Sequence, residues 1–257
     1  MHIKNKFNLE GKVAIITGSS KGIGKAIAKA FAEQGAIVII SSRKQEACEE
    51  VVASFKEEGL IAHAIACHVG DQKSRSDLID KTIAICGGID ILVNNAATNP
   101  VYGPIEDAPM DAFDKIMNIN VKAPWDLANK CLPSMKLRKG GSIINISSIE
   151  GEHPGYGLGL YSTSKAALSM LTKNQAKEWG KHNIRVNAIC PGLIKTKFSS
   201  ALWNNDKIMQ QINHKLPLAR MGQSEEIASV ALMLASEAGS YITGSLLVAD
   251  GGFLISG

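Results

Sequence analysis

The sequence predicts an α/β fold in which a doubly wound parallel sheet of about seven strands carries helices on both faces. Short apolar, β-branched runs alternate with segments of helical periodicity along the chain, and this alternation is typical of parallel strands joined by crossover helices. A glycine-rich loop directly follows the first apolar run, as expected where a strand turns into a helix. The 257 residues show no repeat, linker or low-complexity stretch, so residues 1–257 are predicted to form a single domain.

The expected strands are short apolar runs that read as buried β-structure. They lie at residues 13–17, 37–41, 61–66, 89–93, 142–147, 184–189 and 246–249. Helices fill the gaps, with the longest near 110–137 and 161–180. Because crossovers between parallel strands are right-handed, this order winds helices onto both faces of one sheet.

The loop after the first strand has the features of a phosphate-binding turn. Gly18 permits a sharp turn, Gly22 lets the backbone approach a pyrophosphate, and Gly24 permits close packing of helix on strand. The N-terminus of the following helix attracts an anion. An ordinary strand–helix turn is the alternative, but the flanking strand and helix favour a dinucleotide site. The residues predicted to form it are Gly18, Ser20, Lys21, Gly22, Ile23 and Gly24.

A second pattern indicates proton-transfer chemistry: Tyr161 and Lys165 lie four residues apart, and Ser148 precedes them. Residues four apart share one face of a helix, so the phenol and the ammonium are expected to meet. A nearby cation favours the phenolate, and we expect Lys165 to lower the pKa of Tyr161 toward the working range of a general acid. The bare pattern also fits a helical tyrosine beside a solvated lysine, so its interpretation depends on the rest of the chain.

These motifs, taken over nearly the whole chain, resemble those of the short-chain dehydrogenase/reductase family, whose members have a single-domain Rossmann fold. Further matches are Asn94–Ala97, Asn120, Pro191–Thr196 and Asp250–Gly252. The resemblance implies that the catalytic residues are Asn120, Ser148, Tyr161 and Lys165. Tyr161 and Lys165 would also contact the cofactor. The remaining cofactor contacts that it implies are His68, Val69, Asn95, Ala96, Pro191, Gly192, Ile194 and Thr196.

The implied reaction is hydride transfer from a reduced nicotinamide to a carbonyl carbon, with Tyr161 as the general acid. In this scheme Ser148 holds the substrate oxygen as a positioned donor. By family resemblance, Lys165 also holds the nicotinamide ribose, and Asn120 helps to hold a water that passes protons to the lysine.

A finer resemblance links the chain to one branch of that family, the NADPH-dependent carbonyl reductases called dehydrogenase/reductase SDR family member 4. It rests on Cys67–Gly70, Asn120–Pro124, Leu202-Trp203 and Ser240–Gly244. It implies reduction of ketones, aldehydes and α-dicarbonyls to alcohols. One alternative is a 3-oxoacyl-[acyl-carrier-protein] reductase of fatty-acid synthesis, which shares every catalytic motif. Another is a non-catalytic NADP-binding regulatory module, against which the intact catalytic set argues.

The end of the second strand favours NADP(H) over NAD(H). NAD-preferring folds place an acidic side chain there to bind the ribose 2′-hydroxyl, whereas this chain reads Ser41-Ser42-Arg43-Lys44. Arg43 offers a planar fork suited to a 2′-phosphate, Ser42 lies beside it, and Lys21 adds a second cation. Two solvated surface charges are the alternative. His68 departs from the aspartate usual at this position of the family and matches the member 4 branch.

The substrate pocket is the least determined part of the prediction. Its expected lining combines Ser148 with the loop that follows it and with a lid at about 194–216. The lining residues are Ser148, Glu150, His153, Tyr156, Phe198 and Trp203. Phe198 and Trp203 suggest an apolar or aromatic substrate, but they equally suit a helix whose apolar face packs on the core. His153 is interpreted as either a second acid or a plain loop histidine.

Composition excludes several other classes of protein. The net charge of +4 and the lack of a basic tract with interleaved aromatics argue against nucleic acid. The apolar runs are too short to span a membrane, and the N-terminus lacks a secretory signal. Five scattered cysteines without a Cys-x-x-Cys pair predict neither disulfides nor a metal site. Reduced cysteines and the absence of a C-terminal Ser-Lys-Leu predict a cytoplasmic location. The family resemblance implies a homotetramer formed through the two long helices and the C-terminal strand.

Overall fold

A computed structural model describes residues 3–197, 199, 203 and 216–256. Within these residues, seven strands form one parallel sheet in the order β3-β2-β1-β4-β5-β6-β7. The strands are β1 (Val13–Thr17), β2 (Ile37–Ser41), β3 (Ala62–Ala64), β4 (Ile91–Asn94), β5 (Gly141–Ile146), β6 (Ile184–Pro191) and β7 (Leu246–Ala249). The predicted doubly wound α/β fold is confirmed.

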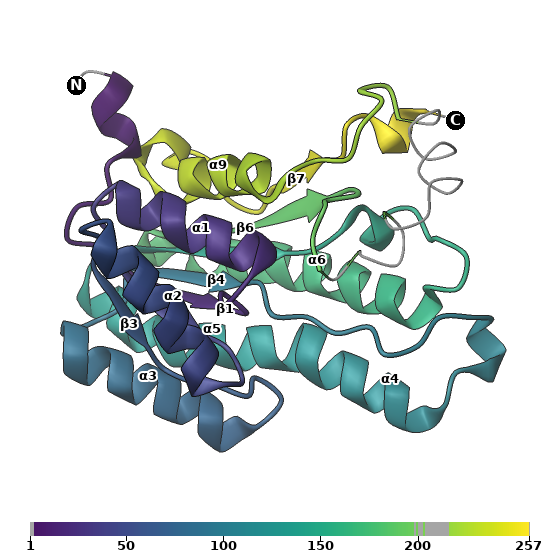
Figure 1. The fold of residues 1–257 in the computed structure, drawn as a ribbon, viewed down its shortest axis with the longest axis horizontal. Coiled ribbons are helices and arrows are strands. Elements are labelled where there is room, and N and C mark those ends of the chain that lie inside the picture. Colours follow the sequence, from purple (N-terminus) through teal and green to yellow (C-terminus); the bar gives the residue numbers. More distant parts are fainter. Residues whose placement is uncertain (1–2, 198, 200–202, 204–215, 257) are drawn as a thin grey trace.

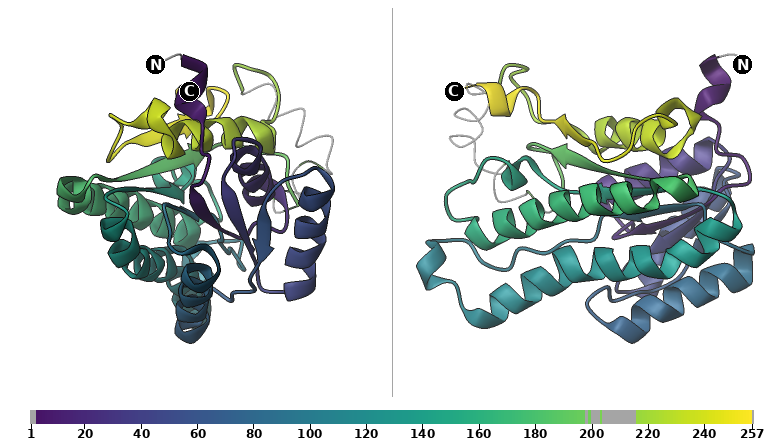
Figure 2. Two further views of the ribbon diagram at one scale, coloured as in Figure 1. Left: turned by 90° about the vertical axis from the view of Figure 1, so that its left-hand side faces the viewer. Right: turned by 180° about the vertical axis from the view of Figure 1, so that it is seen from behind.

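Helices cover both faces of this sheet (Figure 1). One face carries α1 (Gly22–Glu33), α2 (Gln45–Glu57) and α9 (Ser224–Ala235). The other carries α3 (Gln72–Cys86), α5 (Ala123–Leu137) and α6 (Gly159–Trp179). Figure 2 shows the sheet between the two groups. Because both faces are covered, β1 is buried at every residue, which explains why its sequence is a continuous apolar run.

Short 3₁₀ turns complete the described part of the chain. They are η1 (Ile3–Phe7), η2 (Ile105–Asp107), η4 (Ile149–Gly151), η5 (Gly180–His182), η6 (Glu237–Gly239) and η7 (Phe253–Ile255). No helix in the described residues is both long and apolar enough to cross a bilayer.

The long helix predicted near 110–137 is interrupted. Helix α4 (Met110–Met117) passes into a π-helical turn, η3 (Asn118–Lys122), before α5 begins at Ala123. Pro124, the second residue of α5, has no N–H to bond to the carbonyl four residues earlier, which is that of Asn120, so the sequence carries a sign of the interruption that the helical periodicity alone does not show. The turn contains Asn120, which the family resemblance places in the active site, and π-bulges often occur at functional sites.

Two predicted strands are shorter than expected, and a side chain bonds to the backbone at the shortened end of each. Strand β4 begins at Ile91 because Asp90 turns its carboxylate to the backbone N–H of Val13, at 2.9 Å. Strand β3 ends at Ala64, although backbone hydrogen bonds from Ile65 and Cys67 continue toward β2 and the residues after it. On the opposite, free edge of the sheet, the Gln45 side chain donates to the Ala64 carbonyl and accepts from the Ala66 N–H.

The chain order reverses direction between β1 and β4. From β1 the chain winds outward through β2 to β3, and β4 then pairs on the other side of β1. Open α/β sheets hold ligands in the crevice at the carboxyl ends of the strands at this reversal. The residues predicted to bind the cofactor follow these strand ends, so the topology gathers them at one edge of the sheet.

Candidate active site

The glycine loop has the geometry that a dinucleotide requires. Gly18 and Gly22 have φ angles of +67° and +56°, a region that glycine enters readily. A Cβ on Gly24 would lie 2.5 Å from Nδ2 of Asn95 and 2.6 Å from the Gly18 carbonyl oxygen, so no larger residue fits there. No described side chain caps the first turn of α1, which leaves its N–H groups available to an anion.

A hydrogen-bond network fixes the loop to the strand ends. Asn95 donates from Nδ2 to the carbonyls of Thr17 and Gly18, at 2.8 and 3.2 Å. The Thr17 hydroxyl accepts from the backbone N–H groups of Asn95 and Ala96, at 3.0 and 3.1 Å. The buried Ser19 hydroxyl donates to the Ile16 carbonyl and accepts from the Ser41 N–H. Thr17 and Ser19 were not identified from the sequence, although both lie within the glycine-loop segment.

The end of the crevice next to β2 and β3, called the cofactor end below, carries two exposed cations and one buried cation, Arg75. Lys21 and Arg43 are exposed, while Ser42 contacts Cys48 through its hydroxyl at 3.1 Å. His68 is exposed on the loop that leads from β3 to α3. That loop is held by the buried Arg75, which donates to the Val69 carbonyl and to Asp126 Oδ2, each at 2.6 Å.

The carboxyl ends of β5 and β6 bring the predicted catalytic residues together. Ser148 follows β5, and its side chain is hydrogen-bonded to Tyr161 on the first turn of α6. Burial raises the pKa of Tyr161 to about 12; the Ser148 hydrogen bond opposes this rise and the charge of Glu150 adds to it. The phenol is therefore a protonated donor in this structure.

Lys165 lies on the same face of α6 as Tyr161 and is buried, with only 2 % of its surface exposed. Its Nζ lies 5.5 Å from the centroid of the Tyr161 ring and donates to the Ile146 carbonyl at 2.7 Å. Desolvation lowers the pKa of Lys165 to about 8. The prediction that the lysine lowers the pKa of Tyr161 is wrong for this structure, because the desolvation of the phenol dominates.

Asn120 connects the π-turn to the helix that carries the tyrosine. Its Oδ1 accepts from the Thr98 N–H, and its Nδ2 donates to the Thr98 carbonyl and to the Ser164 hydroxyl, at 3.0 Å each. Ser164 donates in turn to the Tyr161 carbonyl at 2.7 Å. Thr98 and Ser164 were missed at the sequence level, although Ser164 lies inside the Tyr-Ser-Thr-Ser-Lys motif.

The turn after β6 closes the other side of the crevice. A Cβ on Gly192 would lie 2.7 Å from the Cα of Asp250, so the Pro191-Gly192 turn packs tightly on the C-terminal turn. Ile194 is buried, and the Thr196 methyl lies 3.5 Å from the Cβ position of Gly22. The turn that the family places over the nicotinamide thus lies beside the glycine loop, so the residues present fit a dinucleotide along the strand ends.

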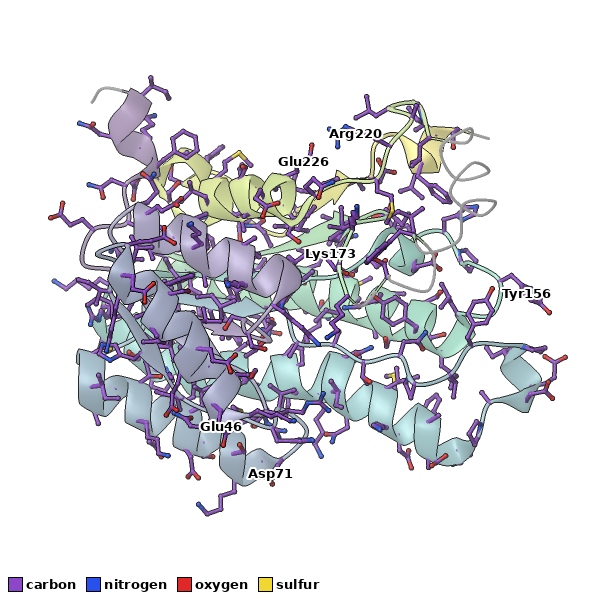
Figure 3. The ribbon with its side chains drawn as sticks, viewed as in Figure 1. Glu46, Asp71, Tyr156, Lys173, Arg220 and Glu226 are labelled. Atoms are coloured by element: carbon purple, nitrogen blue, oxygen red, sulfur yellow. The ribbon has the colours of Figure 1, made fainter. Side chains whose placement is uncertain are left out.

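The predicted pocket residues divide into two groups. Ser148 and Glu150 lie beside Tyr161, and Trp203 donates from Nε1 to the Thr196 carbonyl at 2.9 Å. His153 and Tyr156 are instead exposed, and Figure 3 shows Tyr156 at the outer edge of the molecule. Phe198 and most of the segment 194–216 lie outside the described residues, so the predicted lid is not tested.

Comparison with known proteins agrees with this geometry. A family model described as Enoyl-(Acyl carrier protein) reductase matches residues 18–254. The chain belongs to the short-chain dehydrogenase/reductase family of NAD(P)-dependent oxidoreductases.

Among the relatives of this chain are proteins named dehydrogenase/reductase SDR family member 4. The rabbit protein (Oryctolagus cuniculus) is 47% identical over 95% of this chain and 94% of its own. The human protein is 44% identical over 95% of this chain and 88% of its own.

Two solved structures share the fold closely. A 7α-hydroxysteroid dehydrogenase in complex with NADH and 7-oxo glycochenodeoxycholic acid has a TM-score of 0.94 and 37% identity, covering 98% of both chains. A gluconate 5-dehydrogenase from Burkholderia cenocepacia, in complex with NADP and tartrate, has a TM-score of 0.94 and 32% identity, covering 98% of this chain and 99% of its own.

Proposed function

We propose that this protein is an NADPH-dependent carbonyl reductase that converts ketones, aldehydes and α-dicarbonyls to alcohols. The main support is the hydrogen-bonded pair of Ser148 and Tyr161, with Lys165 buried beneath them at the carboxyl ends of β5 and β6. The likeness to the member 4 relatives supports the substrate class, since they match almost the whole of this chain.

The nicotinamide supplies the hydride when bound. Ser148 donates a hydrogen bond to the carbonyl oxygen and aligns it with the phenol. Tyr161 transfers its proton to the same oxygen as negative charge develops there. Lys165, which donates to the Ile146 carbonyl, would hold the ribose of a bound cofactor, and its positive charge would favour loss of the tyrosine proton. The network of Asn120 and Ser164 keeps the π-turn and α6 in register.

Cofactor selection is proposed to depend on Arg43, with Lys21 contributing from the glycine loop. Both are exposed at the open end of the crevice, where a 2′-phosphate would lie, and no acid follows β2 to bind a 2′-hydroxyl instead. An arginine fork binds a phosphate with paired, charge-assisted hydrogen bonds. The fold by itself does not select the cofactor, because the two similar structures carry NADH in one case and NADP in the other.

The test is oxidation of reduced cofactor by the purified protein, with NADPH and NADH compared in parallel. One substrate is an aryl α-dicarbonyl, and the other is an acetoacetyl thioester. We expect turnover of the dicarbonyl with NADPH preferred. Turnover of the thioester alone would contradict the proposal and indicate a 3-oxoacyl reductase. Cofactor binding without turnover of either substrate would indicate a binding module.

A further inference from the structure

Glu150 joins three parts of the site. It lies in η4, two residues after Ser148, and its Oε2 accepts from the Gly155 N–H at 2.7 Å and from the Ser162 hydroxyl at 3.0 Å. Gly155 belongs to the loop of residues 151–158, and Ser162 directly follows Tyr161 on α6. A single carboxylate oxygen thus ties the loop to the helical turn that presents the phenol.

The 151–158 loop is packed closely around this contact. A Cβ on Gly155 would lie 2.8 Å from both carboxylate oxygens of Glu150, so the glycine lets the acid lie directly against the backbone. A Cβ on Gly151 would lie 2.9 Å from the backbone of Lys165. At its far end, the Gly157 carbonyl accepts from the Gly103 N–H at 3.1 Å. The two ends of the loop therefore pack against or bond to backbone atoms, whereas its middle is held by the Glu150 side chain.

The charge of Glu150 has a second consequence. Helix α6 has no acidic residue in its first turn and no side-chain cap among the described residues, so Glu150 supplies the negative charge that a helix N-terminus favours. The carboxylate lies close to the phenol, because Ser162, which donates to it, is the next residue after Tyr161, and the Glu150 N–H donates to the Ser148 hydroxyl at 3.1 Å. The same charge therefore acts on the Tyr161 hydroxyl and makes its ionised form less favourable. A substrate oxygen bound to that hydroxyl experiences the same field, so a carboxylate on the substrate would be repelled.

We propose that Glu150 is a positioning and specificity-determining residue. Its carboxylate clamps the 151–158 loop to the start of α6, and its charge selects neutral carbonyl substrates over anionic ones. The selection of neutral substrates rests on the proposed carbonyl reduction, whereas the clamp does not depend on it.

Hydrogen exchange of the Gly155 amide tests the clamp without any turnover. In Glu150→Ala the amide loses its acceptor, and we expect its exchange to quicken at least about tenfold, as for loss of a charge-assisted hydrogen bond. Glu150→Gln keeps an acceptor oxygen at the same position, so exchange should stay within about threefold of the unmodified protein. Unchanged exchange in Glu150→Ala would overturn the clamp, whether or not the protein reduces carbonyls.

Paired substrates test the charge. Phenylglyoxylate and its methyl ester present the same aryl ketone, which adjoins a carboxylate in the acid and a neutral ester in the other. We expect Glu150→Gln to raise the ratio of kcat/KM for the acid to that for the ester by about tenfold, because one repulsive charge is removed near the reacting oxygen. Glu178→Gln removes the same charge from an exposed position on α6 and should leave the ratio unchanged. An unchanged ratio in Glu150→Gln would overturn the specificity role, while absence of turnover with every neutral carbonyl would refute the proposed function instead.

Discussion

The two ends of the crevice use charge in opposite ways. At the cofactor end, Lys21 and Arg43 are exposed, and the glycine loop is held by neutral hydrogen bonds and by Gly18 and Gly24, which leave no room for a side chain. The buried Arg75 nearby is paired with Asp126 and holds a loop rather than facing the crevice as a free charge. At the catalytic end, Lys165 is buried and Tyr161 is desolvated, and both have altered pKa values. Exposed charges can select a ligand at little cost in stability, whereas buried charges alter reactivity at the expense of stability.

The largest expected effect is at the catalytic end. Tyr161→Phe removes the proton donor and leaves the ring, so we expect kcat to fall by about 10²- to 10⁴-fold. Binding of NADPH, measured by calorimetry, should be kept because the ring stays in place and the glycine loop, Arg43 and Lys165 are unchanged. Tyr241→Phe is the matched control, since Tyr241 is fully exposed. If Tyr161→Phe kept full turnover, the proposed mechanism would be wrong.

The difference between the two ends also explains what could be predicted from the sequence. The cofactor end depends on local backbone geometry, and the pattern Gly18-x-x-x-Gly22-x-Gly24 after an apolar run reports that geometry directly. The parallel sheet and the helices on both of its faces follow from alternation in the same way. These features need no knowledge of distant contacts.

The catalytic end depends on contacts between distant segments. The π-turn at Asn120 is accompanied by hydrogen bonds to Thr98 and Ser164, which no local pattern reveals. The raised pKa of Tyr161 reflects burial by the assembled fold, so the spacing of tyrosine and lysine gave the residues but the wrong direction of the shift.

The second prediction concerns the stability cost of the buried lysine. The folded protein has a pKa for Lys165 of about 8, below the ordinary value of 10.5, so the unfolded chain binds the proton more strongly between these values. Stability should therefore rise with pH in this window for the unmodified protein but not for Lys165→Met. Below pH 8 the full difference corresponds to about 3 kcal/mol in favour of the variant, before the loss of the bond to the Ile146 carbonyl is subtracted.

Urea unfolding of both proteins without added cofactor, at pH 7.5 and near pH 10, measures this difference. Lys173→Met is the control, because Lys173 is exposed further along α6 (Figure 3). We expect the stability advantage of Lys165→Met over the unmodified protein to shrink as pH rises, while the control shows no such trend. A constant difference at both pH values would mean that the lysine is not destabilised by burial.

The smallest effect is expected at the exposed cofactor end. Arg43→Ala removes a fork proposed to bind the 2′-phosphate, and loss of charge-assisted hydrogen bonds should raise the KM for NADPH by about tenfold to a hundredfold. The KM for NADH should change by less than about twofold, because NADH lacks the phosphate that the fork would bind. The free energy of unfolding should be nearly unchanged, since the side chain is exposed.

Lys56→Ala gives the matched control, because it removes one positive charge from the exposed last turn of α2 without approaching the glycine loop. A rise in KM for NADPH in both variants would indicate a general effect of net charge, which salt would screen equally in each. A rise in KM for both NADPH and NADH in Arg43→Ala would indicate damage to the loop after β2. Only a rise in KM that is confined to NADPH and to Arg43→Ala would show that this exposed arginine selects the cofactor, while the buried lysine serves the chemistry.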